Sequence, residues 1–491
     1  MNLRIFAREA FIYAAGNIGL RAAALLLTPI YTHYLTVADF GAWATIQATI
    51  QIVLIAVTMG MRETFLRYSK EFADEGKLRH LLGTTTTLIL IGGAFVTAIC
   101  VGFLAPFFQI IMKVDNIRQI LMLTCIAAMV QSLTVHVMSY YRSGNQASKF
   151  MKAGLSGATL LFVCTVISVC VLEMGILGAL YAYILAYLTL LIFVARDVFS
   201  QTGLGLALGT VPKFLKFGMP LTLSAVSQFT MTSASIYLLS YYVGLETVAI
   251  FSLGSKFASI MPIVVALPFQ LAFQPLVYSN LTHPEIRQQV GRLFTYMLLA
   301  TCFVTLLLLI ATRILLPLVA PPEYASAFEI TLCLLVGQAF SGIHCFGETI
   351  LGAVQKTHTA AILNASCAVV SLTLGMLLIP LYGWLGAILA IICPIAIVDA
   401  AEVIIGMRSF NALNAFETGR IAMVMLLFIT FLFVSFMLRH AGSVVFYGGM
   451  FVLFVVGFGG LYIGPFCRTQ ERQFVREIGG RLRAFLPARE T

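Results

Sequence analysis

The stretch that decides the fold is residues 11–70, FIYAAGNIGLRAAALLLTPIYTHYLTVADFGAWATIQATIQIVLIAVTMGMRETFLRYSK. Its first apolar run carries a single charge, Arg21, midway between its polar ends. A charge at the centre of a bilayer costs about 2.5–3.5 kcal/mol, which marks it as a functional position. Asn17 and Thr28 lie four residues before and seven after Arg21, so all three share one helical face. The stretch predicts a membrane helix with lipid on one side and a polar environment on the other.

The composition is that of a polytopic membrane protein. Of the 491 residues, 60% are hydrophobic and 10% are charged, whereas soluble domains carry about 25% charged residues. The net charge of +10 has no soluble basic domain to carry it, which argues against nucleic acid as a partner. Most cysteines lie inside apolar runs, and none forms a CxxC or a Cys/His cluster, so we interpret them as packing residues and expect no metal site.

The chain contains fourteen apolar segments, each close to the ~20 residues that span a ~30 Å hydrocarbon core. The sequence therefore predicts an all-α fold of about 14 transmembrane helices. The segments are 10–33, 41–61, 82–105, 118–141, 153–172, 176–195, 215–241, 247–272, 293–316, 326–351, 359–380, 384–407, 420–438 and 443–464.

The distribution of Lys and Arg predicts the orientation. With the N-terminus inside, 24 of these residues lie in cytoplasmic segments and four lie in outer loops. This asymmetry follows the positive-inside rule and places both termini in the cytoplasm. No loop exceeds about twenty residues and no P-loop is present, so we expect a protein that is not an enzyme and has no catalytic residues.

Two segments echo each other. Residues 34–43, YLTVADFGAW, follow the first apolar segment, and residues 241–251, YYVGLETVAIF, follow the seventh. Each has an aromatic end, an acidic turn and a small-aromatic entry into the next helix. Such weak repeats are typical of secondary transporters. We therefore predict a duplication of six helices plus two extra ones, with an N-lobe at 1–200, a C-lobe at 201–410, two further helices at 411–464 and a basic cytoplasmic tail at 465–491.

Three short motifs resemble those of polysaccharide-transport proteins: Tyr34–Trp43, the Phe65–Tyr68 quartet FLRY, and Lys216–Pro220, KFGMP. On these residues the chain resembles the multidrug/oligosaccharidyl-lipid/polysaccharide (MOP) exporter superfamily, and within it the Wzx-type O-antigen flippases. The resemblance implies a MATE-like fold of two pseudo-symmetric six-helix lobes around a central cavity. Many family members carry an Asp-Arg pair late in the seventh helix, where this chain reads SASIY at Ser233–Tyr237.

The candidate substrate-binding residues are cations and amides within the predicted helices. The resemblance places Arg21 and Lys256 at the cavity, where two cations suit a pyrophosphate or an acidic sugar. The alternatives are a structural ion pair or a snorkelling side chain. Side-chain amides either bind sugar hydroxyls or join helices. The amides in question are Asn17 and the i, i+4 pairs Gln47 with Gln51 and Gln270 with Gln274.

The candidate ion-coupling residues are His344, Glu348, Asp399 and Glu402. Glu348 shares a helical face with His344 and either exchanges a proton beside it or neutralises a cavity cation. Asp399 and Glu402, at i and i+3, either bind a cation or pair with Arg408. No cofactor is expected beyond a coupling proton or sodium ion.

These features favour a flippase of the bacterial inner membrane. Its expected substrate is an undecaprenyl-pyrophosphate-linked repeat unit of O-antigen or exopolysaccharide, moved by alternating access. Membrane lipids and other polysaccharide-assembly proteins are the expected partners. The alternative is a MATE-type drug/cation antiporter, which typically presents a carboxylate in its first or seventh helix. The sequence does not define the glycan, its charge, the coupling ion or the oligomeric state.

Overall fold

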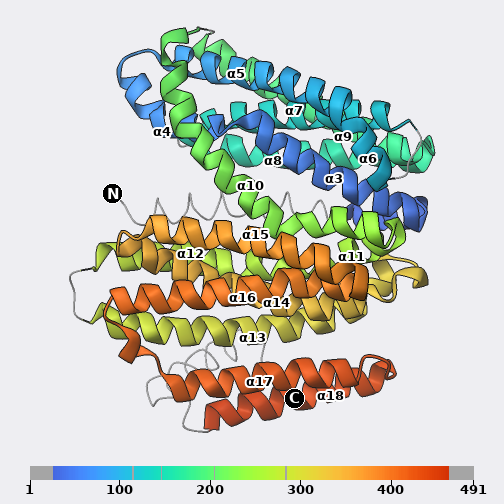
Figure 1. Ribbon diagram of the computed structural model, residues 1–491, viewed down its shortest axis with the longest axis vertical. Coiled ribbons are helices and arrows are strands. Elements are labelled where there is room, and N and C mark those ends of the chain that lie inside the picture. The colour runs from blue at the N-terminus through green and yellow to red at the C-terminus, as the bar shows by residue number, and fades with distance from the viewer. Residues whose placement is uncertain (1–25, 113–115, 145, 204, 282–284, 464–491) are drawn as a thin grey trace, which may run out of the picture.

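The computed structural model describes residues 26–112, 116–144, 146–203, 205–281 and 285–463 (Figure 1). Two predicted site residues, Asn17 and Arg21, lie outside this part. All described elements are helical. They are α2 (Thr28–Tyr34), α3 (Val37–Thr58), α4 (Met61–Asp74), α5 (Leu78–Ile99), η1 (Cys100–Leu104), α6 (Ala105–Met112), α7 (Ile117–Ser143), α8 (Ala147–Thr165), η2 (Val166–Val171), α9 (Gly175–Thr202), η3 (Leu208–Thr210), α10 (Val211–Tyr242), α11 (Leu245–Ala258), η4 (Pro262–Ala266), α12 (Leu267–Ser279), α13 (Ile286–Val319), η5 (Pro322–Tyr324), α14 (Ala327–Ala353), α15 (Thr357–Tyr382), α16 (Trp384–Ser409), η6 (Leu413–Ala415), α17 (Thr418–Met437) and α18 (Ser443–Ile463).

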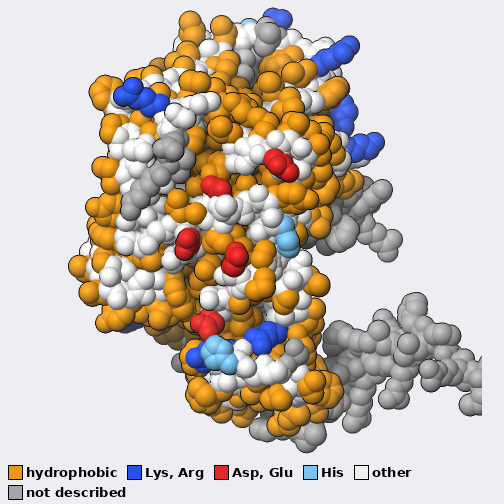
Figure 2. Space-filling model, turned by 90° about the vertical axis from the view of Figure 1, so that its right-hand side faces the viewer, with side chains coloured by type: hydrophobic (Ala, Val, Ile, Leu, Met, Phe, Trp, Pro, Cys, Tyr) orange, Lys and Arg blue, Asp and Glu red, His pale blue; other side chains and the backbone are white. Residues whose placement is uncertain are grey.

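The predicted all-helical membrane architecture is confirmed. Eleven helices of the described part are long and apolar enough to cross a membrane. The Ser- and Thr-rich α10 and the shorter apolar run of α18 are not among these eleven. Hydrophobic side chains cover most of the face seen in Figure 2, and the charged side chains on it are few. A surface of this kind suits a hydrocarbon solvent.

The helices form three tiers (Figure 1). The upper tier holds α3 to α9, the middle tier α11 to α16, and the lower tier α17 and α18. The long helix α10 crosses from the upper tier to the middle one. It contacts α3 and α4 above and α15 and α16 below.

A polar cap begins α3, the helix at the centre of the contacts between the tiers. Thr36 Oγ1 accepts a hydrogen bond from the Asp39 backbone N–H at 3.1 Å and donates one to Asp39 Oδ2 at 2.7 Å. A threonine N-cap with an acid three residues on satisfies N–H groups that a helix start leaves free. The acidic turn predicted from the repeat is therefore a helix cap.

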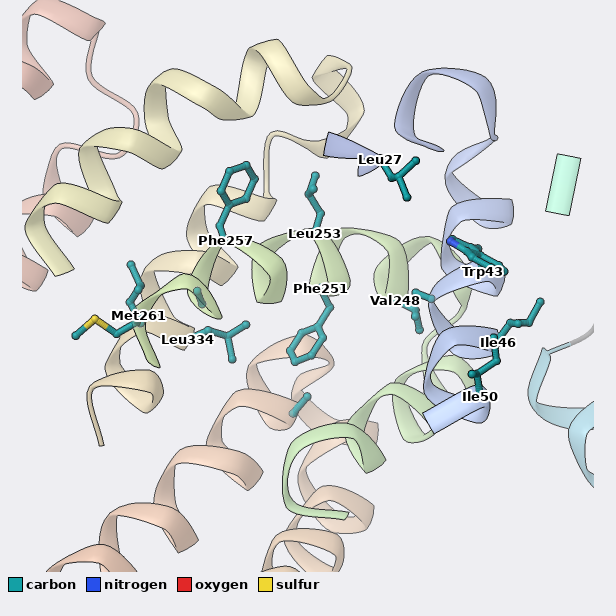
Figure 3. Packing of buried hydrophobic residues seen from close by; sticks show 14 of the residues in the cluster. Leu27, Trp43, Ile46, Ile50, Val248, Phe251, Leu253, Phe257, Met261 and Leu334 are labelled. Atoms are coloured by element: carbon teal, nitrogen blue, oxygen red, sulfur yellow. The ribbon is translucent and has the colours of Figure 1, made fainter. Parts of the chain in front are cut away.

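The two echoing segments meet in space, because α3 and α11 cross at their first turns. A Cβ on Gly41 would lie 1.9 Å from the Leu245 carbonyl oxygen, so only glycine allows this contact. Figure 3 shows Val248 of α11 against α3, with Trp43 and Ile46 on the opposite side of α3. One face of α3 thus packs on the middle tier, and the opposite face packs on the other helices of the upper tier.

A second close contact joins α10 to the upper tier. Gly60, with a φ of +68°, lies against Gly218, where an added Cβ would come within 2.4 Å of the Gly218 carbonyl oxygen. Nearby, the Tyr68 ring lies 5.7 Å from the Phe217 ring, and Lys213 Nζ lies 2.8 Å from a Glu71 carboxylate oxygen. The FLRY and KFGMP motifs are therefore the two sides of one contact between α4 and α10.

We expect Gly41→Ala to destabilise the protein, because the new methyl group would push α3 and α11 apart. Overpacking of this kind costs about 1–3 kcal/mol. The measurement is the thermal unfolding midpoint of the purified protein in detergent. Gly448→Ala is the matched control, since Gly448 lies in α18 with open space around its Cβ position. Equal midpoints for the two variants would contradict the proposed contact.

Candidate functional site

Lys256 is a cation at the junction of the upper and middle tiers, and no acid of the described residues pairs with it. It lies in the last turn of α11, half-buried, and its Nζ is 5.0 Å from the centre of the Phe40 ring of α3. In the described part of the chain its ammonium makes no ion pair and no hydrogen bond. The alternative of a structural ion pair therefore finds no support there. A cation–π contact stabilises an ammonium but leaves its three donors available.

The predicted glutamines of α3 lie on the same face as Phe40. At about 100° per residue, Gln47 and Gln51 fall within about 20° of Phe40 around the helix axis. Gln47 is half-buried and Gln51 is exposed. On α12, Gln270 is half-buried and Gln274 is exposed. None of these four amides joins helices by a hydrogen bond among the described residues, so their donors and acceptors are available to a ligand.

A second polar site lies inside the middle tier, between α14 and α16. His344 Nδ1 is 3.2 Å from Asp399 Oδ1 and 3.1 Å from Glu402 Oε2. The two carboxyl side chains are buried, with exposures of 3% and 0%, whereas the imidazole is 25% exposed. They are the only buried acids in the described ranges. The histidine therefore connects this acidic pair with the surface.

The chemistry of this cluster is that of a cation site. Asp399 Oδ2 and both Glu402 oxygens lack a hydrogen-bond donor, and buried acceptors of this kind are costly. With His344 protonated and both carboxylates ionised, the cluster carries one net negative charge, which one proton or one monovalent cation would neutralise. The ligand atoms of the three residues lie within 4.8 Å of one another.

The structure corrects the pairing expected for these residues. Glu348 is exposed on α14 and makes no ion pair within the described chain, and His344 instead meets the acids of α16. Asp399 and Glu402 likewise approach His344 rather than Arg408. The cause is the close packing of α14 on α16, where a Cβ on Gly347 would lie 2.8 Å from the Glu402 Cβ. That glycine was the one sequence signal for the contact.

The buried His136 of α7 belongs to the core of the upper tier. Its Nε2 lies 3.0 Å from Thr85 Oγ1, and its ring packs edge-on against Phe65. It has no carboxylate partner among the described residues, unlike His344. Of the buried histidines and acids, those of the middle tier therefore form the candidate ion site.

The bundle thus places a cation between the upper and middle tiers and an acidic site inside the middle tier. Solved structures of MOP superfamily transporters have a similar fold. Lipid II flippase MurJ in an inward closed conformation superposes with a TM-score of 0.71 at 14% identity, over 92% of this chain and 98% of that one. A Vibrio cholerae MATE transporter, VcmN, gives a TM-score of 0.60 at 17% identity, over 84% and 98%. A Pyrococcus furiosus MOP transporter with a binding pocket of reverse polarity gives 0.52 at 15% identity, over 84% and 96%.

The family model described as polysaccharide biosynthesis protein matches residues 6–281, more than half of the chain. The protein therefore belongs to the polysaccharide biosynthesis protein family. A comparison with curated sequences gives no match.

We expect His344→Ala to destabilise the protein strongly, because it removes the imidazole that lies within 3.2 Å of both buried carboxylates. Removing one partner of a buried pair costs about 3–5 kcal/mol. The measurement is again the unfolding midpoint in detergent, with His358→Ala as control because His358 is exposed on α15. Adding Asp399→Asn and Glu402→Gln to His344→Ala should restore most of the loss. A midpoint that His344→Ala leaves unchanged would show that the cluster is not electrostatically coupled.

Proposed function

We propose that this protein is a flippase that moves an undecaprenyl-pyrophosphate-linked oligosaccharide across the bacterial inner membrane. The observation that carries the proposal is Lys256 at the junction of the two tiers, where no described acid pairs with its ammonium. An ammonium inside a membrane bundle without an acidic partner is costly unless a ligand supplies negative charge. The family match to polysaccharide biosynthesis proteins supports a glycan substrate, and a pyrophosphate linker provides the negative charge.

Lys256 and the two glutamines on the same face of α3 suit the two parts of such a head group, the pyrophosphate and the sugars. The ammonium offers three donors to phosphate oxygens or an acidic sugar, whereas Gln47 and Gln51 offer amides on the same side of α3 to sugar hydroxyls. The polyprenyl tail would remain in lipid, and Arg21, which lies outside the described residues, would add a second cation. The glutamine amides would then bind the sugars, and the positive charges would bind the pyrophosphate linker.

The drug/cation antiporter alternative fits these observations less well. Such an antiporter typically offers a carboxylate in its first or seventh helix to a cationic ligand. Described helix α10 contains no acid between Val211 and Tyr242, and the polar group at the junction of the tiers is a cation. The sign of the charge at the junction therefore favours an anionic ligand.

Contacts between the tiers support alternating access. At the end of the bundle where α3 begins, Thr32 of α2 donates a 2.6 Å hydrogen bond to the Val319 carbonyl oxygen of α13, and Phe40 packs edge-on against Tyr324. The contact of Gly41 with Leu245 lies at this same end. We propose that this end faces the periplasm, in agreement with the cytoplasmic termini predicted from charge, and that these contacts break when the site opens outward.

The proposed driving ion is a proton, bound by the cluster of His344, Asp399 and Glu402. Nδ1 of His344 lies within hydrogen-bonding distance of both carboxyl groups and occupies the space between them. Sodium, which prefers oxygen ligands, would have to displace the imidazole, whereas a proton fits the hydrogen-bonded geometry. Protonation would remove the cluster's net charge and thereby favour one packing of α14 on α16.

We expect Lys256→Met to reduce export of the lipid-linked glycan about tenfold or more, since a hydrogen bond to a charged group contributes about 1.5–3 kcal/mol and 1.4 kcal/mol is a factor of ten. The measurement is the lipid-linked repeat unit that accumulates in a null strain complemented with each variant at matched protein levels.

Lys256→Arg should retain most activity in this assay because it keeps the charge. Lys152→Met is the matched control, since Lys152 is exposed on α8. Normal export by Lys256→Met would contradict the substrate site. A null strain with intact surface glycan and lost resistance to cationic compounds would favour the antiporter.

We expect Glu402→Gln to uncouple transport from the proton gradient, because the amide cannot accept the coupling proton. The measurement is uptake of lipid-linked oligosaccharide into proteoliposomes with an imposed pH gradient, a sodium gradient or neither. Glu348→Gln is the control, since Glu348 lies outside the cluster. Stimulation of wild type by sodium alone, or an unchanged pH response in Glu402→Gln, would overturn the proton assignment.

A further inference from the structure

An apolar cavity lies on the side of α3 away from Lys256. Its volume is about 790 Å³, and its walls come from α3, α5, η1 and α6 of the upper tier and from α10 and α15. Around α3, Ile52 and Ala56 of the cavity wall lie about 120–160° from Phe40. The cavity is therefore separate from the proposed head-group site, and one helix lies between them.

The length of the cavity indicates what kind of ligand can occupy it. Along α10 its lining runs from Phe229 to Tyr242, about 20 Å at 1.5 Å per residue. An apolar space of this length fits extended hydrocarbon.

The apolar side chains that line the cavity also indicate a hydrocarbon ligand. The lining side chains carry no charge, and Phe107 and Ile110 of α6 are exposed by 60% and 56%. Large apolar side chains that are exposed on a membrane-spanning helix suit contact with lipid. The wall is also irregular, because the π-helix η1 interrupts the helical span there. Such π-bulges occur frequently at functional sites.

One end of the cavity suits the head group of a lipid. Tyr241 and Tyr242 line it at the end of α10 and are half-exposed, at 49% and 45%. Tyrosines at helix ends are typical of the membrane–water interface, where the ring lies in hydrocarbon and the hydroxyl in the polar layer. The cavity therefore begins at the interface and continues into the hydrocarbon layer.

We propose that this cavity binds an acyl chain of a phospholipid from the leaflet at the end of the bundle where α3 begins. The chain would contact both tiers beside the hydrogen bonds that join them, from Tyr237 to Thr49 at 3.1 Å and from Ser240 to the Ile111 carbonyl oxygen at 2.8 Å. A ligand that binds only this arrangement of the tiers stabilises it. The bound lipid would therefore favour the present closed contact, whatever the transported substrate is.

The test is photolabelling of the full-length protein in nanodiscs with a phosphatidylethanolamine whose acyl chain carries a diazirine, followed by peptide mapping. We expect label on the peptides that contain Phe107 and Tyr237. Ala234→Trp should reduce it at least about tenfold, because losing even two buried CH₂ contacts has that effect on affinity.

Ala56→Phe, on the opposite wall, should give the same loss if the cavity is filled. Val369→Trp is the matched control, since Val369 is a lipid-exposed residue of α15 outside the cavity. Label spread evenly over lipid-facing peptides, or unchanged in both filling variants, would overturn the proposal. Loss of label on adding an equimolar polyprenyl phosphate would also overturn it and assign the cavity to a polyprenyl chain.

Discussion

The structure depends on the direct backbone contact between α3 and α11 at Gly41 and Leu245. Without a side chain at residue 41, two helices from different tiers cross close enough for a carbonyl oxygen to occupy the Cβ position. Close helix approach through small residues is the main packing device in membranes, because lipid is as apolar as the helices and hydrophobic burial does not drive their association. The contact fixes where each of the other faces of α3 points.

These faces meet four different environments. Trp43 and Ile46 pack in the upper tier, and Gly41 packs on α11. Phe40 lies beside Lys256, on the face of α3 that also carries Gln47 and Gln51. Thr49 and Ala56 face α10 and the apolar cavity. A small rotation of α3 against α11 would therefore change the head-group site and the cavity together. This is how a rigid helix can link substrate binding to a movement of the tiers.

The two candidate polar sites differ in charge and in place. Lys256 lies at the junction of the tiers without an acidic partner among the described residues, whereas Asp399 and Glu402 lie inside the middle tier with a histidine. Separation prevents the ammonium from neutralising the acids, so each site keeps its affinity for an ion of opposite sign. In the function that we propose, an anionic substrate and a coupling proton would bind at the same time, connected only by the packing of the helices.

The sequence by itself determined the helical membrane class and the order of the spans. These follow from hydrophobic run length and from local rules such as the Thr36 cap, which depend on neighbouring residues alone. The sequence also singled out Lys256, since a charge in an apolar run is costly wherever the helix packs.

The tertiary structure decided which residues of different helices meet. His344 meets Asp399 and Glu402 rather than Glu348, and the cavity beside α3 exists only because α6, α10 and α15 come together. Both result from contacts between helices far apart in the chain, and no local pattern of hydrophobicity or charge specifies which faces meet.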